Sequence, residues 1–558
     1  MSGGGLNRPS ATRAASARFL AEGDRGMSEL TTRPSREEYD SQSTVARAAA
    51  RLGIADLHPE QKQAIKAAFA KRDVLVVLPT GFGKSACYQV PSLIFPRPVI
   101  WVSPLLSLLR DQHEKLLQLQ VPCVRIDSTV RGRARSTSLA RLAAGGPLLL
   151  MTTPETLGSG EAQHALLRSG VALAAVDEAH CISEWGHDFR PAYLRLGERL
   201  RGLGAPPVMA LTATATMSVR NDIIRALGMR DPLVIASSPH RANLAFEVIP
   251  CGGSERLRAL VRLARRLRRP GLVYCSTTRA VDELRGLLER FGVPTHGYHG
   301  RMTAAQRMAE QGAYLAPHRR TVMVATSAFG LGIDKPDIRY VLHYQSPASL
   351  EQYVQEAGRA GRDGRRAQCI LLHGTEDRAV HEALHAKSRV RPEQLYKLGH
   401  ALAAWAAESR VPTLEALALS SSLGPRIAAA LVAVVAEAGI VRSQDSSVEI
   451  LASANRVEDD VRRLARQFET LRTQDGHRLD LVASYAHSHE CRALFLRRYF
   501  GEGEGAPCGL CDVCRARRPY PASFWEPLAT PARLGTRRAR RAFGKRRAGG
   551  RWLARPRR

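Results

Sequence analysis

Two adjacent acids follow directly on an apolar run near the middle of the chain. Asp177 and Glu178 come after Val171 to Val176, whose composition is typical of a buried strand. A carboxylate at the end of a strand can hold Mg²⁺, and its neighbour can orient or deprotonate an attacking water. The pair predicts a site for phosphate hydrolysis, with Asp177 as metal ligand and Glu178 as base. A solvated acidic turn is the alternative.

A glycine-rich turn upstream offers the phosphate cradle that this chemistry needs. Val74 to Leu78 predicts a second buried strand, and the sequence PTGFGKS follows it. Backbone N–H groups can close around phosphate oxygens there, and the helix expected next aims its positive dipole end at them. Lys84 would reach the β and γ phosphates, and the Ser85 hydroxyl would bind Mg²⁺. Leu78 replaces the first glycine of the strict pattern, so a turn without ligand stays an alternative. The predicted nucleotide-binding residues are Pro79, Thr80, Gly81, Phe82, Gly83, Lys84 and Ser85.

Two arginines much later in the chain could neutralise charge on a transferred phosphoryl group. Arg359 and Arg362 lie in QEAGRAGRDG, about 270 residues beyond Lys84, which favours a second domain facing the first. Removing such an arginine costs about 10³ to 10⁵ in rate. We expect Arg362, rather than Arg359, to be this finger. A solvated loop or a phosphate-backbone contact is the alternative.

Aromatic and charged side chains follow the acidic pair. The run CISEWGHDFRP supplies rings and a guanidinium that could stack on unpaired bases or bind phosphate, while a packed tryptophan is the alternative. With the hydrolytic residues, this run predicts a nucleic-acid-dependent ATPase. The candidate DNA-coupling residues are Trp185, His187, Phe189 and Arg190.

The last four cysteines have the spacing of a metal site. Cys491, Cys508, Cys511 and Cys514 contain two overlapping Cys-x2-Cys steps, which allow four thiolates to converge on one tetrahedral ion. Zinc is the expected ion, and an iron–sulfur cluster is the alternative. A disulfide is disfavoured because no secretion signal is evident and the other six cysteines are scattered singly.

Together and in this order, the motifs resemble the RecQ family of ATP-dependent DNA helicases, within helicase superfamily two. The resemblance covers about residues 57–373 and resumes at 491–514, and it includes the runs LHPEQKQAI, VSPLLSLLRDQ, LTATAT, YHGRM and VATSAFGLGIDKPDIRYVLHY. It implies ATP, Mg²⁺ and Zn²⁺ as cofactors, and 3′ to 5′ translocation on single-stranded DNA with duplex unwinding in recombination or repair. It also implies that Gln61 recognises adenine, although Leu57 and His58 depart from the family's Phe-Arg pair. The aromatic-rich loop would couple DNA binding to hydrolysis, and the cysteines would form the family's zinc subdomain.

Two other functional classes remain open at this point. RecQ enzymes usually carry a winged helix after the zinc site, but only a basic segment follows Cys514 here. An ATP-driven remodelling or strand-annealing protein with weak unwinding therefore stays a candidate. An RNA helicase is permitted by the DEAH letters and disfavoured by the aromatic loop and the zinc site. The expected partners are single-stranded and forked or junction duplex DNA, with single-stranded-DNA-binding and repair proteins as further candidates.

Charge and composition point to a polyanion partner. The 558 residues suggest three or four domains and carry a net charge of +30. From Arg515 to Arg558, 15 Lys/Arg accompany the single acid Glu526, which predicts a disordered, DNA-tethering tail or, alternatively, a solubilising end. The longest apolar candidate for a membrane span, Ile427 to Val441, is too short. We expect a bacterial, cytoplasmic, nucleoid-associated protein.

The order of these motifs predicts an α/β protein. Alternating strand and helix patterns predict two RecA-like domains with doubly wound parallel sheets, followed by a helical, winged-helix-like segment and a zinc-binding helical subdomain. The leader is predicted to be disordered, with a transit peptide or a start at Met27 as alternatives. The expected divisions are a leader at 1–44, RecA-like domains at 45–238 and 239–378, an insert at 391–455, a zinc subdomain at 456–515 and a basic tail at 516–558.

The insert is the main departure from the family pattern. Val411 to Arg442 predicts two amphipathic helices joined at Ser420 to Arg426, followed by a strand. This order is typical of a winged helix, and simple helical packing is the alternative. We expect the insert to bind duplex or junction DNA better than single strands.

Overall fold

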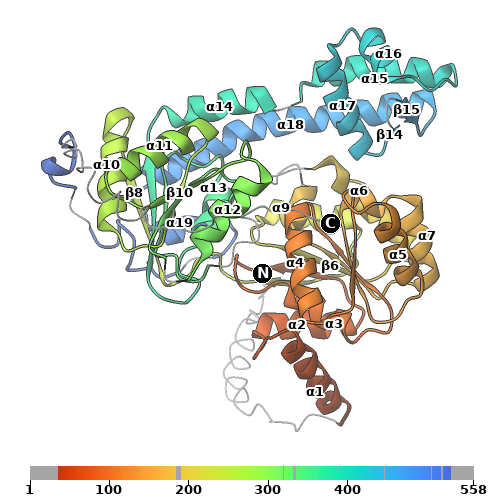
Figure 1. Cartoon of the computed structure of the whole chain (residues 1–558), viewed down its shortest axis with the longest axis horizontal. Helices are drawn as coiled ribbons and strands as arrows, with labels where there is room; N and C mark the ends of the chain where they lie inside the picture. Colours follow the sequence, from red (N-terminus) through yellow and green to blue (C-terminus); the bar gives the residue numbers. More distant parts are fainter. Residues whose placement is uncertain are drawn as a thin grey trace, which may run out of the picture. The chain divides into compact units, whose positions relative to one another are not determined.

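Short aliphatic runs alternate with amphipathic segments between Val74 and His373, and these runs form the strands of two parallel sheets in the computed structural model (Figure 1). The structure describes residues 36–183, 190–317, 319–330, 335–388, 390–444, 447–503, 505–516 and 519–528. Two compact units are distinguished, one up to Asp56 and one from Leu57 onward. The expected α/β architecture is confirmed for the second unit.

The first RecA-like domain is built on seven parallel strands in the order β3-β4-β2-β5-β6-β1-β7. Helices lie on both faces, so the central strands are buried and apolar throughout. The strands are β1 Val74–Val77, β2 Val99–Val102, β3 Cys123–Ile126, β4 Leu149–Thr152, β5 Leu173–Val176, β6 Val208–Thr212 and β7 Leu233–Ala236. The helices are α2 Pro59–Phe69, α3 Ala86–Ser92, α4 Leu106–Gln118, α5 Gly132–Ala143, α6 Pro154–Leu157, α7 Gly160–Ser169, η1 Ala179–Ile182, η2 Pro191–Tyr193, α8 Leu196–Gly202 and α9 Met217–Leu227.

The second RecA-like domain has six parallel strands in the order β10-β11-β9-β12-β13-β8. Helices α10 and α11 cover one face, and α13 with the end of α18 covers the other. The strands are β8 Leu244–Pro250, β9 Gly271–Tyr274, β10 Thr295–Tyr298, β11 Val322–Ala325, β12 Tyr340–His343 and β13 Ala367–His373. The helices are α10 Gly253–Arg266, α11 Thr278–Arg290, α12 Ala304–Leu315 and α13 Leu350–Ala357.

A hairpin of two helices leaves the second domain and carries the insert. α14 (Asp377–Ser388) runs beside the later part of α18 (Ala454–His487), and an ion pair between Arg378 and Asp480 joins them. The insert comprises α15 Pro392–Ala407, α16 Leu414–Ser420, α17 Pro425–Glu437, β14 Val441–Gln444 and β15 Ser447–Ile450. These elements gather around the beginning of α18 (Figure 1). After α18 come α19 Arg492–Tyr499 and the short helix η3 Ala522–Phe524.

The insert has the element order of a winged helix. α16 and α17 meet at 107°, as in a helix-turn-helix, and the antiparallel pair β14–β15 follows. Thr413 also forms an isolated antiparallel bridge with Ser447. The core joins these elements to α15 and α18 through apolar side chains such as Leu398, Leu431 and Val461.

Two predicted boundaries need correction. The leader was predicted to extend to residue 44, but α1 begins at Arg36 and runs to Arg51. Its second half is rich in alanine, the strongest helix former. The tail was predicted to be disordered from residue 516, but the described residues 519–528 pack on α10. Tyr520, Phe524 and Trp525 join its apolar core, which the charge count alone did not indicate.

No single helix among the described residues is long and apolar enough to cross a membrane; the bent pair α16–α17 passes that test only as a pair.

Candidate active site and metal centre

The phosphate cradle lies between β1 and α3, at the carboxyl edge of the first sheet. Gly81 and Gly83 have φ of 87° and 76°, a conformation that side chains with a Cβ rarely adopt. Ser85 is the N-cap residue of α3, so the first amides of this helix face the turn. Lys84 Nζ donates a hydrogen bond to the carbonyl of Leu78 at 3.0 Å. Desolvation lowers the pKa of Lys84, while Glu178 and Asp177 act in the opposite sense.

Gln61 on α2 is held against the same turn. Its side-chain amide donates to the carbonyls of Phe82 at 3.0 Å and Gly83 at 2.9 Å. Its Oε1 accepts from the backbone N–H of His58 at 2.8 Å. The His58 and Phe82 rings are 4.5 Å apart between centroids. A glutamine amide and two rings therefore lie beside the cradle, which is the chemistry needed to hold a purine base.

The acidic pair follows β5, two strands from β1 in the sheet. Burial and the neighbouring Glu178 raise the pKa of Asp177 to about 7, and Lys84 opposes this shift. Glu178 adopts a left-handed backbone conformation with φ of 46°, and its Oε2 lies 3.4 Å from His180 Nδ1. The same ring nitrogen is 3.0 Å from Thr212 Oγ1. Glu178 is thus connected through His180 to the LTATAT run, a link that the sequence did not reveal.

The two candidate arginines have different surroundings. A Cβ placed on Gly81 would lie 2.9 Å from Arg362 Nε, so Arg362 reaches the cradle and also lowers the pKa of Lys84. Arg359 is buried, at 4% exposure, and donates to the carbonyl of Gly330. The structure therefore brings Arg362, and not Arg359, to the phosphate-binding turn.

Three of the four DNA-coupling candidates, Trp185, His187 and Phe189, lie outside the described residues. The two ends of their loop are fixed in place. The backbone N–H of Arg190 donates to the carbonyl of Cys181 at 2.9 Å, and Arg190 Nη1 donates to the carbonyl of Pro104 at 3.1 Å. Pro104 belongs to VSPLLSLLRDQ, so Arg190, at the end of the loop, lies beside another of the motifs.

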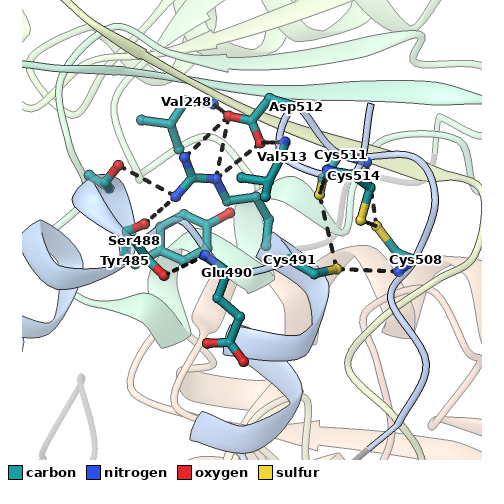
Figure 2. Close-up of polar contacts among 12 residues, drawn as sticks. Val248, Tyr485, Ser488, Glu490, Cys491, Cys508, Cys511, Asp512, Val513 and Cys514 are labelled. Atoms are coloured by element: carbon teal, nitrogen blue, oxygen red, sulfur yellow. Dashed lines mark hydrogen bonds and ion pairs between the residues drawn. The ribbon is translucent and has the colours of Figure 1, made fainter. Parts of the chain in front are cut away.

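The four cysteines converge as predicted. Their Sγ atoms all lie within 4.8 Å of one another, and the Cys508–Cys514 and Cys511–Cys491 pairs are each 4.0 Å apart (Figure 2). These separations are too long for disulfides, whose S–S distance is about 2.05 Å. Tetrahedral thiolate ligation with Zn–S of about 2.3 Å needs S–S distances near 3.8 Å. The cluster therefore fits zinc.

The metal centre is joined to the edge strand of the second sheet. Asp512, between two of the cysteines, accepts from Arg492 Nε at 3.0 Å and from the backbone N–H of Val248 at 3.0 Å (Figure 2). Its own N–H donates to the carbonyl of Phe246 at 3.0 Å. Phe246 and Val248 belong to β8, which is the edge strand of the sheet. The segment around Asp512 therefore forms hydrogen bonds along the outer side of this strand. No sequence signal singled out Asp512 or Arg492.

Family models match three segments of the chain. They are the DEAD/DEAH box helicase model at residues 58–223, the helicase conserved C-terminal domain at 255–364 and RecQ zinc-binding at 458–515. The chain is 40% identical over 320 residues to "ATP-dependent DNA helicase RecQ" of a Synechocystis strain, covering 56% of this chain and 67% of that protein. The chain belongs to the RecQ family.

A second relative matches a longer part of the chain. "ATP-dependent DNA helicase RecQ" of Bacillus subtilis is 40% identical over 451 residues, covering 80% of this chain and 63% of that protein. The chain spans between 25% and 63% of the length of six curated RecQ relatives that it matches. The fold resembles that of the helicase MrfA bound to DNA and AMPPNP, with a TM-score of 0.50 at 17% identity over 73% of this chain and 61% of that one. This likeness concerns the fold alone.

The winged-helix insert has few features of a DNA reader. Residues 391–455 hold five Lys/Arg and six Asp/Glu, in a chain that is otherwise strongly basic. The exposed positions of α17, the second helix of the helix-turn-helix, include one arginine, Arg426, beside Ile427, Ala430 and Glu437. This composition weighs against groove binding, and the expected preference for duplex DNA stays a prediction.

Proposed function

We propose that this RecQ protein is an ATP-dependent DNA helicase that moves 3′ to 5′ on single-stranded DNA and unwinds duplex in recombination or repair. The single observation that carries the proposal is the complete hydrolytic set at one turn, where Arg362 approaches Gly81 beside Lys84 and the acidic pair. Each domain contributes to this set. A change in the distance between the domains on ATP binding and release therefore supplies the translocation step.

Nucleotide binding is assigned to the cradle and to Gln61. Lys84 would exchange its bond to the Leu78 carbonyl for the β and γ phosphates, and the amides of residues 81–85 would bind phosphate oxygens. Ser85 and Asp177 would hold Mg²⁺, which when bound offsets the negative charge of the phosphates. Gln61 would recognise adenine from its position beside Phe82.

Hydrolysis is assigned to Glu178 and Arg362. Glu178 would orient and deprotonate the attacking water, and its Oε2 lies 3.4 Å from His180 Nδ1. Arg362 would neutralise charge on the departing γ-phosphoryl group. Arg359 is proposed to support the fold of the second domain through Gly330 rather than to touch nucleotide.

DNA coupling is assigned to the loop with Trp185, His187, Phe189 and Arg190. Arg190 contacts Pro104, and the other end of the loop follows η1, which carries His180. Bases bound to this loop would therefore affect Glu178 through His180. Forked or junction duplex, and single-stranded-DNA-binding or repair proteins, are proposed as partners in a bacterial cytoplasm, with association to the nucleoid.

The test measures ATP turnover with single-stranded DNA and with RNA, together with unwinding of 3′-tailed, 5′-tailed and forked duplexes. DNA-stimulated turnover and unwinding of the 3′-tailed substrate are expected. Turnover with little unwinding but rapid annealing of complementary strands would identify a strand-annealing protein instead. Stimulation by RNA alone would identify an RNA helicase.

A further inference from the structure

Arginines precede four neighbouring strands of the second sheet. A pair stands before each of β11, β9 and β13, and a single arginine stands before β12. These four strands are adjacent in the sheet order β11-β9-β12-β13. The three pairs, called the amino-edge arginines because they stand at the amino ends of the strands, are Arg268, Arg269, Arg319, Arg320, Arg365 and Arg366.

Hydrogen bonds between the strand starts make the row continuous. The N–H of Gly271 donates to the carbonyl of Thr321 at 3.1 Å, and the N–H of Arg339 donates to that of Pro270 at 2.8 Å. The N–H of Gln368 then donates to the carbonyl of Arg339 at 3.0 Å. With strands about 4.8 Å apart, the row extends over about 15 Å.

The amino-edge arginines are exposed, apart from the half-buried Arg269. In the part of the chain that the structure describes, no carboxylate oxygen lies within 4.0 Å of their guanidinium groups. Arg339, in the middle of the row, differs because it pairs with Asp363 at 2.7 Å. Asp363 offsets part of this charge, since, against desolvation, Arg339 and Arg365 help to lower its pKa, but clustered like charges repel one another and lower stability.

A helix dipole does not account for these side chains. Arg265 and Arg266 stand in the last turn of α10, where the negative end of the helix favours cations, so they do not belong to the row. Strand starts have no comparable dipole. The carboxyl edge of the same sheet has a different character, with polar residues such as Ser276 and Gln345 joined by a 3.0 Å hydrogen bond.

We propose that the amino-edge arginines form a second DNA-binding surface, which holds the phosphate backbone of duplex DNA independently of the motor. Duplex carries one negative charge per about 1.7 Å of its axis, the charge density that such a row complements. Single strands are usually held by aromatic stacking as well, and the residues that follow the three pairs, Pro270, Thr321 and Ala367, have no aromatic ring. This surface goes beyond the proposed helicase activity because it needs no ATP.

The test uses the full chain with Arg268→Gln, Arg319→Gln and Arg320→Gln combined. Binding of a blunt duplex is measured by fluorescence anisotropy at several salt concentrations without nucleotide. If each arginine binds one phosphate, the log–log salt slope for duplex should fall by about 2.7. The affinity at low salt should fall roughly tenfold or more. Single-stranded-DNA-stimulated ATP turnover and the thermal unfolding midpoint should stay at wild-type values.

A matched variant controls for net charge. Arg201→Gln, Arg225→Gln and Arg230→Gln remove the same charge from exposed positions of the first domain, and its duplex slope should stay close to that of the wild type. Equal slopes in both triple variants would overturn the proposal. A loss confined to single-stranded DNA would show that the surface holds a different partner and would also overturn it.

A competition experiment separates this surface from the motor. Wild-type protein saturated with unlabelled oligo-dT should still bind the labelled duplex, and the triple variant should bind it far less. Displacement of the duplex by oligo-dT would place both ligands on one surface and contradict the proposal. No ATP is added in this experiment, so its result can be interpreted even if the helicase assignment fails.

Discussion

Lys84 and Glu178 contribute to the same site in separable ways. Lys84→Ala removes the charge that would hold the β and γ phosphates, so ATP binding and turnover should both be lost. Glu178→Gln leaves the cradle and its glycines intact, so ATP binding should persist while turnover falls by about 10² to 10⁴. Nucleotide binding and phosphate release are measured for both variants. Turnover at the wild-type rate in Glu178→Gln would remove this residue from the role of base.

The two arginines of QEAGRAGRDG should behave differently on substitution. Arg362→Ala should lower kcat by about 10³ to 10⁵ with an unchanged unfolding midpoint, because its side chain approaches Gly81 of the cradle. Arg359→Ala removes a buried guanidinium bonded to the Gly330 carbonyl, so it should lower the unfolding midpoint. Thermal scans and single-turnover ATP hydrolysis distinguish the two. A stable Arg359→Ala protein with kcat reduced as strongly as in Arg362→Ala would reverse the assignment.

The buried carboxylate of Asp177 should reduce stability at neutral pH. Its pKa is raised to about 7 by burial and by Glu178, above the ordinary value of about 3.9 for an unfolded chain. Between these values the unfolded state has lost its proton and the folded state keeps it, so this group lowers stability as pH rises. In nucleotide-free protein, Asp177→Asn should therefore raise the unfolding midpoint more at pH 8 than at pH 5. An equal rise at both pH values would contradict the shift.

Residue types and spacing were enough to predict most of the site. The strand–turn–helix around Lys84, the acids after β5 and the four cysteines each have local signatures that a single sequence carries. The sequence favoured Arg362 over Arg359 as the finger, and the structure adds that the Arg362 side chain approaches Gly81. The His180–Thr212 contact and the Asp512 anchor join residues far apart in the chain, and no local pattern records them.

At the scale of elements, residues 519–528, which follow the zinc site, form a strap that packs on α10 of the second domain. Phe524 is 7% exposed, its ring stacks on Tyr520 with centroids 4.1 Å apart, and its carbonyl accepts from Arg262. Phe524→Ala should detach the strap, since truncating a buried aromatic costs about 3 to 5 kcal/mol. Faster protease cleavage within 516–528 is the expected measurement, with the exposed Glu526→Ala as control. Equal cleavage of both variants would mean that the strap does not depend on this ring.

The zinc centre should stabilise strand β8 as well as the loop that carries its cysteines. Elemental analysis is expected to give one zinc per chain, and Cys511→Ser should give poorly folded protein because structural zinc binding is worth roughly 10 to 16 kcal/mol in apparent terms. Asp512→Asn keeps all four ligands but weakens the bonds to Arg492 and Val248. It should retain zinc and show faster amide exchange in β8. A zinc content of zero, or iron in its place, would overturn the metal assignment.

Element types were more predictable than element ends. The helices on either side of Ser420 to Arg426 and the strand after them follow from apolar periodicity and turn residues, so the winged-helix order could be expected. The start of α1 at Arg36 and the ordered strap were missed because composition suggested disorder at both ends. Residues 519–528 contain three aromatic side chains and no Lys or Arg, so they supply apolar area that a charge count over the whole of 515–558 hides.

On the scale of the whole molecule, charge is distributed unevenly. The chain carries +30 in total, yet the winged-helix insert has more acids than bases, while arginines concentrate at one edge of the second sheet and after the strap. A polyanion would therefore be attracted to particular surfaces rather than to the chain as a whole. The sequence revealed the total and the basic tail, but only the sheet order brought three distant arginine pairs into one row.

The helix α18 belongs to two cores at once. Its first half packs in the winged-helix core through Val457 and Val461, and its second half packs in the second RecA-like domain through Val482 and Tyr485. It is a single helix of 34 residues, so its ends are about 50 Å apart. Such a rod would act as a lever arm anchored in the second RecA-like domain. A rotation of that domain by about 10° would carry the far end of α18 through roughly 9 Å.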